Sequence, residues 1–244
     1  MWSGPRCRST ALMRAWESRP DTAVVDEPLY GVYLAATGLD HPGRDAILDA
    51  MPIDWRDVAG ALAGPVPDGA AVWYQKHMAH HLLPEVGRGW LDDPSFRHAF
   101  LIRNPAALVV SLDRVWPDPS LADTGLPQQV ELFDRVRQRG GAPPAVVDAD
   151  DLLRDPPGTL RALCAALDVA FDVAMLAWPP GPRDSDGVWA EHWYANVWES
   201  TGFGEPREPP PVNVPARLAP LVDAARPLYE QLAAERLGRT TGSV

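Results

Sequence analysis

Short apolar segments rich in β-branched residues recur along this chain, and helical segments separate them. Strands are expected at TAVVDE (22–27), in a segment that ends near Lys76, at RHAFLIR (97–103) and at PAVVDA (144–149). Strands that alternate with helices favour a parallel sheet with helices on both faces. The sequence therefore predicts a three-layer α/β/α fold with a mainly parallel central sheet.

Helical periodicity predicts the helices that accompany these strands. They are expected at residues 9–19, 41–51, 53–64, 105–115, 126–139, 158–169 and 217–237, and Pro227 should kink or break the last one. With 244 residues and 46% hydrophobic content the chain can bury a full core, so we expect one domain over residues 1–244.

Charge and composition disfavour several function classes. A net charge of −11 argues against a nucleic-acid partner, because phosphates need a basic surface. The sequence has no apolar run of about 18 residues that could span a membrane, and no apolar signal stretch at its start. Two cysteines are too few for a disulfide framework, so we expect a cytoplasmic protein.

The stretch WSGPRCRSTALM (2–13) has the composition of an anion-binding loop that leads into a helix. Gly4 permits a tight turn, Arg6 supplies a cation, and Ser9 and Thr10 supply hydroxyl donors beside the unpaired N–H groups of a helix N-terminus. The stretch lacks the second glycine and the lysine of the G-x-x-x-x-G-K-[ST] loop, which argues against a standard ATPase or GTPase.

A second candidate anion contact is FLIRNPAALVVS (100–111), where Arg103 ends a strand and Ser111 lies on the following helix. Their side chains could converge on one phosphate. Arg103, Arg6, Glu27 and Lys76 all fall at or just after expected strand ends. Because ligands of parallel sheets bind outside the carboxyl ends of the strands, these four residues predict one site.

Together these two stretches resemble the sulfotransferases that use 3′-phosphoadenosine 5′-phosphosulfate (PAPS). The resemblance implies a P-loop NTPase-like sulfotransferase fold. In that family the first loop holds the 5′-phosphosulfate, and an R-[ND]-P-x(5)-S segment holds the 3′-phosphate. Carried over, the first element consists of Arg6, Cys7, Arg8, Ser9 and Thr10, and the second of Arg103 and Ser111.

The family's third element is a Gly-rich loop that returns over the nucleotide, and GPRDSDGVWAEHWY (181–194) stands in its place. Arg183, Gly187 and Trp189 are the expected contacts, with Trp189 as a candidate to stack on adenine. The family's spacing of basic residue and glycine is not reproduced. The family also has a full strand before the first loop, so the strand before Gly4 is either very short or truncated.

Two groups are candidates for the base that takes the acceptor proton. Glu27 ends the second strand, and several bacterial and tyrosylprotein sulfotransferases resemble this arrangement, with a glutamate as base. Its neighbour Asp26 should point to the opposite face if the strand continues. The rival is His77, which follows Lys76 in YQKHMAHHLLP (74–84).

Lys76 is the only lysine among the 22 lysines and arginines. It resembles the lysine of the K-x-H segment in cytosolic sulfotransferases, which contacts the sulfate and precedes a histidine base, although here His77 follows directly. His80 and His81 should share a helical face with His77 and line or pack the acceptor pocket. That spacing could also bind zinc, but no carboxylate ligand is implied.

These observations predict a PAPS-dependent sulfotransferase that acts on a hydroxyl or amine of a small-molecule acceptor without a metal. Arg6 and Lys76 would neutralise the transferring group. The alternatives are a P-loop kinase and a catalytically silent nucleotide-binding protein of the same fold. The sequence leaves open the acceptor, the oligomeric state and the choice between Glu27 and His77 as base.

Overall fold

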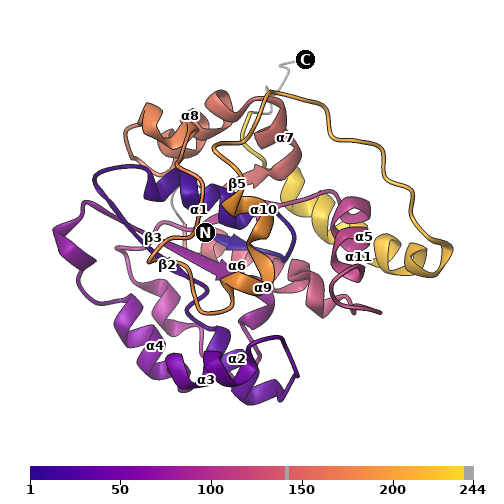
Figure 1. The fold of residues 1–244 in the computed structure, drawn as a ribbon, viewed down its shortest axis with the longest axis horizontal. Helices are drawn as coiled ribbons and strands as arrows, with labels where there is room; N and C mark the ends of the chain where they lie inside the picture. Colours follow the sequence, from indigo (N-terminus) through magenta and orange to yellow (C-terminus); the bar gives the residue numbers. More distant parts are fainter. Residues whose placement is uncertain (141–142, 239–244) are drawn as a thin grey trace.

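The computed structural model describes residues 1–140 and 143–238, in which five parallel strands form a central sheet (Figure 1). The strands are β1 (Trp2–Ser3), β2 (Thr22–Asp26), β3 (Val72–Met78), β4 (Ala99–Ile102) and β5 (Ala145–Asp148). Their order is β2-β3-β1-β4-β5, so the shortest strand is central. The three-layer α/β/α prediction is confirmed.

The first strand is short but fully embedded. Trp2 pairs with His77 of β3 and with Phe100 of β4, and Ser3 continues both ladders. Trp2 and Ser3 are buried, so two residues suffice to align the neighbouring strands around the loop that follows.

Helices cover both faces of the sheet. They are α1 (Ser9–Glu17), α2 (Tyr30–Thr37), α3 (Arg44–Ala50), α4 (Trp55–Leu62), α5 (Pro105–Asp113), α6 (Leu126–Gln138), α7 (Ala149–Arg154), α8 (Pro156–Ala166), α9 (Ala190–Trp193), α10 (Ala195–Trp198) and α11 (Ala219–Ala233). Across the described residues, none has the length and apolar character needed to cross a membrane.

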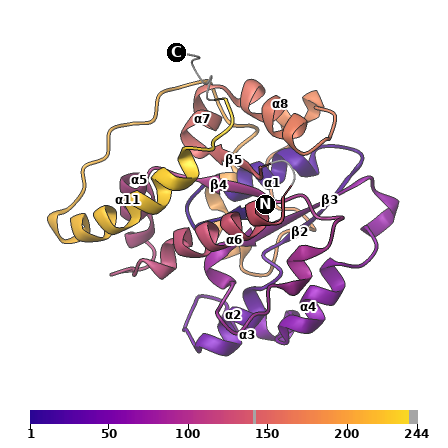
Figure 2. The ribbon, with the colours of Figure 1, turned by 180° about the vertical axis from the view of Figure 1, so that it is seen from behind.

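Alternate strand residues feed two separate cores, as the pleat requires. Leu101 packs with α1, α5 and α8, whereas Phe100 and Ile102 pack on the other face with α4, α6 and α11. The second view places α6 and α11 in front of the sheet (Figure 2). A third cluster joins α2 and α3 to Trp189 and Tyr194. These two residues belong to residues 181–207, which we call the C-terminal segment.

Some element boundaries differ from the sequence prediction. No helix was predicted over Tyr30–Thr37, where α2 forms. α9 and α10 were also missed, because each is a single short turn. α11 continues through Pro227, so the predicted break does not occur. Neighbouring packing against α5 and α6 keeps the helix intact despite the lost hydrogen bond.

Candidate functional site

The loop between β1 and α1 has a backbone suited to anions. Arg6 (φ 60°) and Arg8 (φ 66°) are left-handed, and a Cβ at Gly4 would lie 2.2 Å from the backbone oxygen of Thr124. α1 begins at Ser9 with no side-chain cap and no acidic residue in its first turn. Its first N–H groups and positive dipole end therefore face the loop unopposed, as in known anion-binding helix starts.

Arginines crowd around this loop. Arg6 Nε donates to Ser111 Oγ at 3.2 Å, and Arg103 Nη1 donates to the backbone oxygen of Arg6 at 2.7 Å. Burial, and then the charge of Arg103, lower the pKa of both Arg6 and Arg8; Arg207 acts on Arg8 in the same direction. Among the described residues, the buried Nε atoms of Arg8 and Arg103 have no hydrogen-bond partner. This concentration of unpaired positive charge favours a bound anion.

A cavity of about 730 Å³ opens at the carboxyl ends of the strands. We call the part beside β1 and β4 the cationic half; it is lined by Arg6, Arg8, Ser9, Thr10, Arg103, Ser111 and Arg207. We call the part beside β2 and β3 the aromatic half; it is lined by Glu27, Tyr30, His41, His80, His81, Trp116 and Trp193. The strand order separates the two halves, because β1 and β4 are neighbours and β2 lies beyond β3.

Glu27 is the acidic group at the base of the aromatic half. Its Oε1 accepts a hydrogen bond from Lys76 Nζ at 2.6 Å, and Lys76 also donates to Asp26 Oδ1 at 2.7 Å and to the hydroxyl of Tyr194 at 2.8 Å. Burial raises the pKa of Glu27, Lys76 opposes the rise and Asp26 adds to it. Burial acts to lower the pKa of Lys76, but Asp26 and Glu27 outweigh it and raise that pKa well above its ordinary value.

Strand alternation predicted that Asp26 and Glu27 point to opposite faces of the sheet, but their side chains meet at Lys76. β2 ends at Asp26, and Glu27 has a left-handed φ of 42°, so the pleat does not continue through it. Both carboxylates consequently meet Lys76, which sits opposite Asp26 in the β2–β3 register. The prediction was wrong because it assumed one more strand residue.

His77 lies away from the cavity. Its ring stacks on Trp2 at 4.1 Å, its Nε2 lies 3.3 Å from Gln75 Oε1, and burial lowers its pKa well below the ordinary value. Lys76 and His77 are consecutive residues of β3, so their side chains lie on opposite faces. The geometry brings Glu27, and not His77, to the cavity.

His80 and His81 line the aromatic half beyond the end of β3. His81 stacks on the rings of Tyr30 and Tyr33, each at 4.7 Å, and His80 lies 6.2 Å from the ring of Trp116. Burial lowers the pKa of His80 to about 3 and that of His81 well below its ordinary value, so both rings are neutral. Among the described residues, no group of three His, Cys, Asp or Glu side chains could hold a metal ion.

Cys7 stands apart from the other residues expected in the loop. Its side chain is buried in the core with α1, and its thiol donates to the backbone oxygen of Pro5 at 3.5 Å. Burial raises the pKa of Cys7 to about 12, which keeps the thiol protonated. Ser9 and Thr10 do line the cavity.

The proposed third element lies close to the cavity, but its three expected contacts do not line it. Trp189 is buried, donates from Nε1 to the Tyr194 hydroxyl at 3.2 Å and meets the ring of Tyr30 edge-on, so its ring is not free to stack on a base. A Cβ at Gly187 would lie 2.1 Å from the ring of Trp189, which explains this glycine as a packing requirement. Arg183 donates to the backbone oxygen of Pro179.

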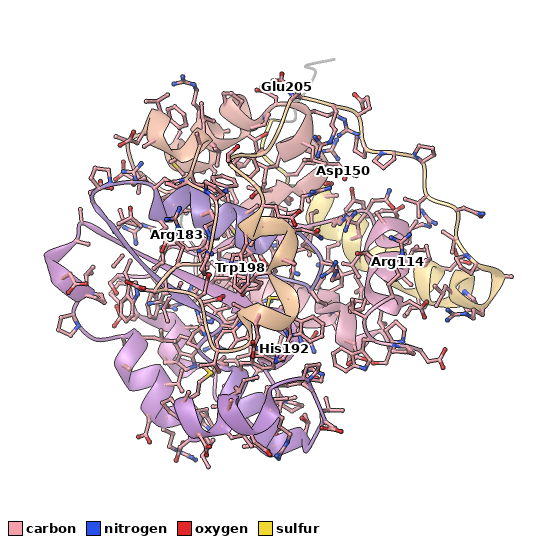
Figure 3. The ribbon with its side chains drawn as sticks, in the orientation of Figure 1. Arg114, Asp150, Arg183, His192, Trp198 and Glu205 are labelled. Atoms are coloured by element: carbon pink, nitrogen blue, oxygen red, sulfur yellow. The ribbon has the colours of Figure 1, made fainter. Side chains whose placement is uncertain are left out.

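The C-terminal segment meets the cavity farther along the chain, between Trp193 and Arg207. It crosses in front of the sheet in Figure 1, and Figure 3 labels Trp198 on it. Arg14 of α1 anchors the segment through Asp186, with contacts of 2.5 and 2.7 Å, and Trp198 Nε1 donates to the same carboxylate at 3.0 Å.

Sequence reasoning missed Tyr194 and Arg207 as site residues. Tyr194 lay at the end of the stretch examined for a Gly-rich loop, but glycine spacing drew attention to Gly187. Arg207 stands in EPREPPPVNVP (205–215), a proline-rich stretch for which no strand or helix was predicted. The sequence signal for Arg207 was a cation shortly after the tryptophan-rich stretch. No sequence signal pointed to Tyr194.

The fold and the site define a class: an α/β protein with an arginine-lined cavity at the carboxyl edge of a parallel sheet. The family model of a sulfotransferase domain matches residues 1–236, and the chain belongs to this family.

Two curated relatives come from Arabidopsis thaliana. Branched-chain-amino-acid aminotransferase-like protein 1 is 41% identical and protein 2 is 36% identical, each over 95% of this chain. The chain spans only 40% of the length of either relative.

Solved structures share the fold. The sulfotransferase domain of the Synechococcus PCC 7002 olefin synthase has a TM-score of 0.53 and 18% identity, with 91% of this chain and 92% of that chain covered. The sulfotransferase domain of the curacin biosynthetic pathway has a TM-score of 0.57 and 16% identity, with 95% of each chain covered. Their likeness shows a common architecture.

Proposed function

We propose that this chain transfers the sulfuryl group of PAPS to a hydroxyl or amine of a small-molecule acceptor. One observation carries the proposal: buried, unpaired guanidinium donors at a helix N-terminus share a cavity with the partly accessible carboxylate of Glu27. The first arrangement suits a multiply charged anion, and the second suits proton abstraction beside it. Membership of the sulfotransferase domain family supports sulfuryl transfer in general.

The cationic half would hold the donor. Arg6 with Ser9 and Thr10 would contact the 5′-phosphosulfate at the start of α1, and Arg103 with Ser111 would contact the 3′-phosphate. Arg6 Nε already reaches Ser111 Oγ at 3.2 Å, so the two phosphate positions would be linked by one side chain. Arg8 and Arg207 border the same space and would add charge compensation.

Glu27 would act on the acceptor in a single in-line step. Its carboxylate would take the proton from the acceptor hydroxyl or amine as the acceptor atom bonds to sulfur. The sulfur–oxygen bond to the 5′-phosphate breaks, and the electron pair stays on that oxygen. Arg6 and the N–H groups of α1 would stabilise the charge left there, so positioning and electrostatics supply the catalysis.

The names of the Arabidopsis relatives belong to proteins more than twice as long as this chain. Aminotransferases attach pyridoxal phosphate to a lysine as a Schiff base. The one lysine of this chain, Lys76, has a side chain only 1% exposed and is bound by two carboxylates, so it is not available for such a bond. We therefore propose that aminotransfer does not belong to this chain.

Calorimetry with 3′-phosphoadenosine 5′-phosphate (PAP), the nucleotide product, tests the proposal. PAP should bind at least about tenfold more tightly than AMP, because only PAP offers a 3′-phosphate to Arg103 and Ser111. Ser111→Ala should weaken that preference, and Arg56→Met, a surface change on α4, should leave it intact. Equal affinity for PAP and AMP would refute the donor assignment.

The two alternatives give different results in the same experiments. A silent nucleotide-binding protein would bind PAP but transfer nothing from PAPS to a broad acceptor panel. A kinase would hydrolyse ATP in a Mg²⁺-dependent manner.

A further inference from the structure

Lys76, Asp26 and Tyr194 form a closed group around one oxygen of Glu27. We propose that Lys76 is a positioning residue, fixed by Asp26 and Tyr194, that aims Glu27 at the acceptor and keeps it ionised, instead of contacting the transferring sulfuryl group. The inference rests on the proposed function, because it assigns the base of that reaction. It changes the role that the sequence suggested for Lys76.

All the N–H groups of Lys76 are already hydrogen-bonded within the protein. A lysine ammonium has three N–H groups. Lys76 Nζ donates one to Asp26 Oδ1 at 2.7 Å, one to Glu27 Oε1 at 2.6 Å and one to the Tyr194 hydroxyl at 2.8 Å. The side chain is only 1% exposed. No N–H group is left to bind a sulfate, and Lys76 is not among the residues that line the cavity.

The same count selects Glu27 over Asp26 as the base. The Tyr194 hydroxyl has one proton, which it donates to Asp26 Oδ2 at 2.6 Å while accepting from Lys76 and from Trp189 Nε1. Both oxygens of Asp26 are therefore occupied, and its side chain is only 2% exposed. Among the described residues, Glu27 Oε2 has no hydrogen-bond partner, and the Glu27 side chain is 12% exposed and lines the cavity.

Charge gives Lys76 its second effect. One ammonium stands between two buried carboxylates, so the group carries one excess negative charge when both are ionised. Burial and the charge of Asp26 raise the pKa of Glu27, and Lys76 opposes them. Without Lys76 the pKa of Glu27 would lie higher still, which favours the protonated form that cannot accept a proton.

Tyr194 links this group to the donor side of the cavity. It lies on the C-terminal segment that also supplies Arg207 to the cationic half, and the Arg14–Asp186 ion pair holds that segment on α1. Docking of one segment thus completes the base in one half and the cation set in the other.

The experiment compares Tyr194→Phe and the double variant Lys76→Met/Asp26→Asn with the unchanged chain. The double variant removes one positive and one negative charge together, which avoids leaving two buried carboxylates unpaired. The first readout is the titration of Glu27 by carbon NMR, assigned with Glu27→Gln. The second is the pH profile of sulfuryl release from PAPS to an acceptor or to water. The third is PAP affinity by calorimetry.

We expect the double variant to raise the pKa of Glu27, but by less than the roughly 1–3 units expected for loss of an opposite charge alone, because the loss of Asp26 offsets part of the loss of Lys76. The acidic limb of the pH profile should move upward by the same amount. Tyr194→Phe should give a smaller shift in the same direction, and PAP affinity should change less than about threefold in both variants. The matched control is Arg103→Met, which should lower PAP affinity and leave the Glu27 titration unchanged.

Two results would overturn the inference: an unchanged Glu27 titration in the double variant, or a loss of PAPS or PAP affinity as large as that caused by Arg103→Met. The proposed function fails separately, if the unchanged chain does not prefer PAP to AMP. The NMR titration does not depend on that result, so the two failures are distinguishable.

Discussion

In the cationic half of the cavity the buried Nε atoms of Arg8 and Arg103 have no partner among the described residues, whereas in the aromatic half every N–H of Lys76 is used. The first half holds guanidinium N–H groups that a bound anion could pair with. In the second half, Lys76 pairs with two buried carboxylates, and one oxygen of Glu27 stays free. Under the proposed function, the first half would receive the donor and the second would maintain the base.

The difference also explains why arginine serves one half and lysine the other. A guanidinium has five donors in a fixed fork, so Arg103 can hold the backbone of Arg6 and still offer N–H groups to a phosphate. An ammonium has three, and three fixed acceptors exhaust it. A single lysine in an arginine-rich chain is therefore consistent with a structural partner of Glu27.

The largest effect that the comparison predicts is on Glu27 itself. Glu27→Gln should lower sulfuryl transfer by about 10²–10⁴-fold, since loss of a general base costs this much, while PAP affinity stays within about twofold. Transfer from PAPS across an acceptor panel measures it, with Asp40→Asn, an exposed carboxylate of the cavity rim, as the control. A Glu27→Gln variant with full activity would remove Glu27 as the base.

Separating the C-terminal segment from α1 should act on both halves at once. Arg14→Met breaks a buried ion pair with Asp186, whose side chains are 1% and 4% exposed, and should lower the free energy of unfolding by about 3–5 kcal/mol. Urea denaturation measures this. The control Arg56→Met breaks an exposed pair with Asp54 and should cost no more than about 1 kcal/mol. Equal effects of the two changes would contradict the anchoring role.

Within the cationic half, Arg103→Met should weaken PAP binding by about 10–100-fold, the value of a charge-assisted hydrogen bond. AMP binding should change far less, because AMP has no 3′-phosphate. Calorimetry with both nucleotides measures the difference. A loss that is the same for PAP and AMP would mean that Arg103 does not contact the 3′-phosphate.

The smallest effect near neutral pH concerns the histidines. Burial lowers the pKa of His80 to about 3, and those of His77 and His81 fall well below the ordinary 6.5. The unfolded chain therefore binds protons that the folded chain excludes, so stability falls as pH drops below about 6.5, by at most about 1.4 kcal/mol per unit for each histidine.

Thermal unfolding between about pH 8 and pH 5 checks this expectation. The midpoint should fall more steeply below pH 6.5 than above pH 7, where only the buried amine of Met1 adds a slope, and His80→Gln should reduce the slope below pH 6.5. A midpoint that does not change with pH would show that these rings are accessible to protons in the folded state.

The sequence predicted the layers of the fold, and the residues of its two motifs line one cavity, because those features are local. The first strand, the glycine after it and the arginine-rich start of the next helix form one continuous segment. The strand before Arg103 and the helix that carries Ser111 form another. Their backbone direction follows from adjacent residues, so spacing in the sequence becomes spacing in the site. The predicted interpretation of Lys76, His77 and Trp189 was less successful, since each depends on partners far away in the chain.

The sequence by itself determined an α/β sheet, an acidic net charge, and two motifs that place cations at strand ends. Tertiary structure alone decided which groups meet. The end of β2 at Asp26 turned both carboxylates toward Lys76, which lies opposite in the register, and the C-terminal segment brought Tyr194 to the same point. Side-chain partners of this kind come from strand order and from long-range packing, which no local pattern of residues encodes.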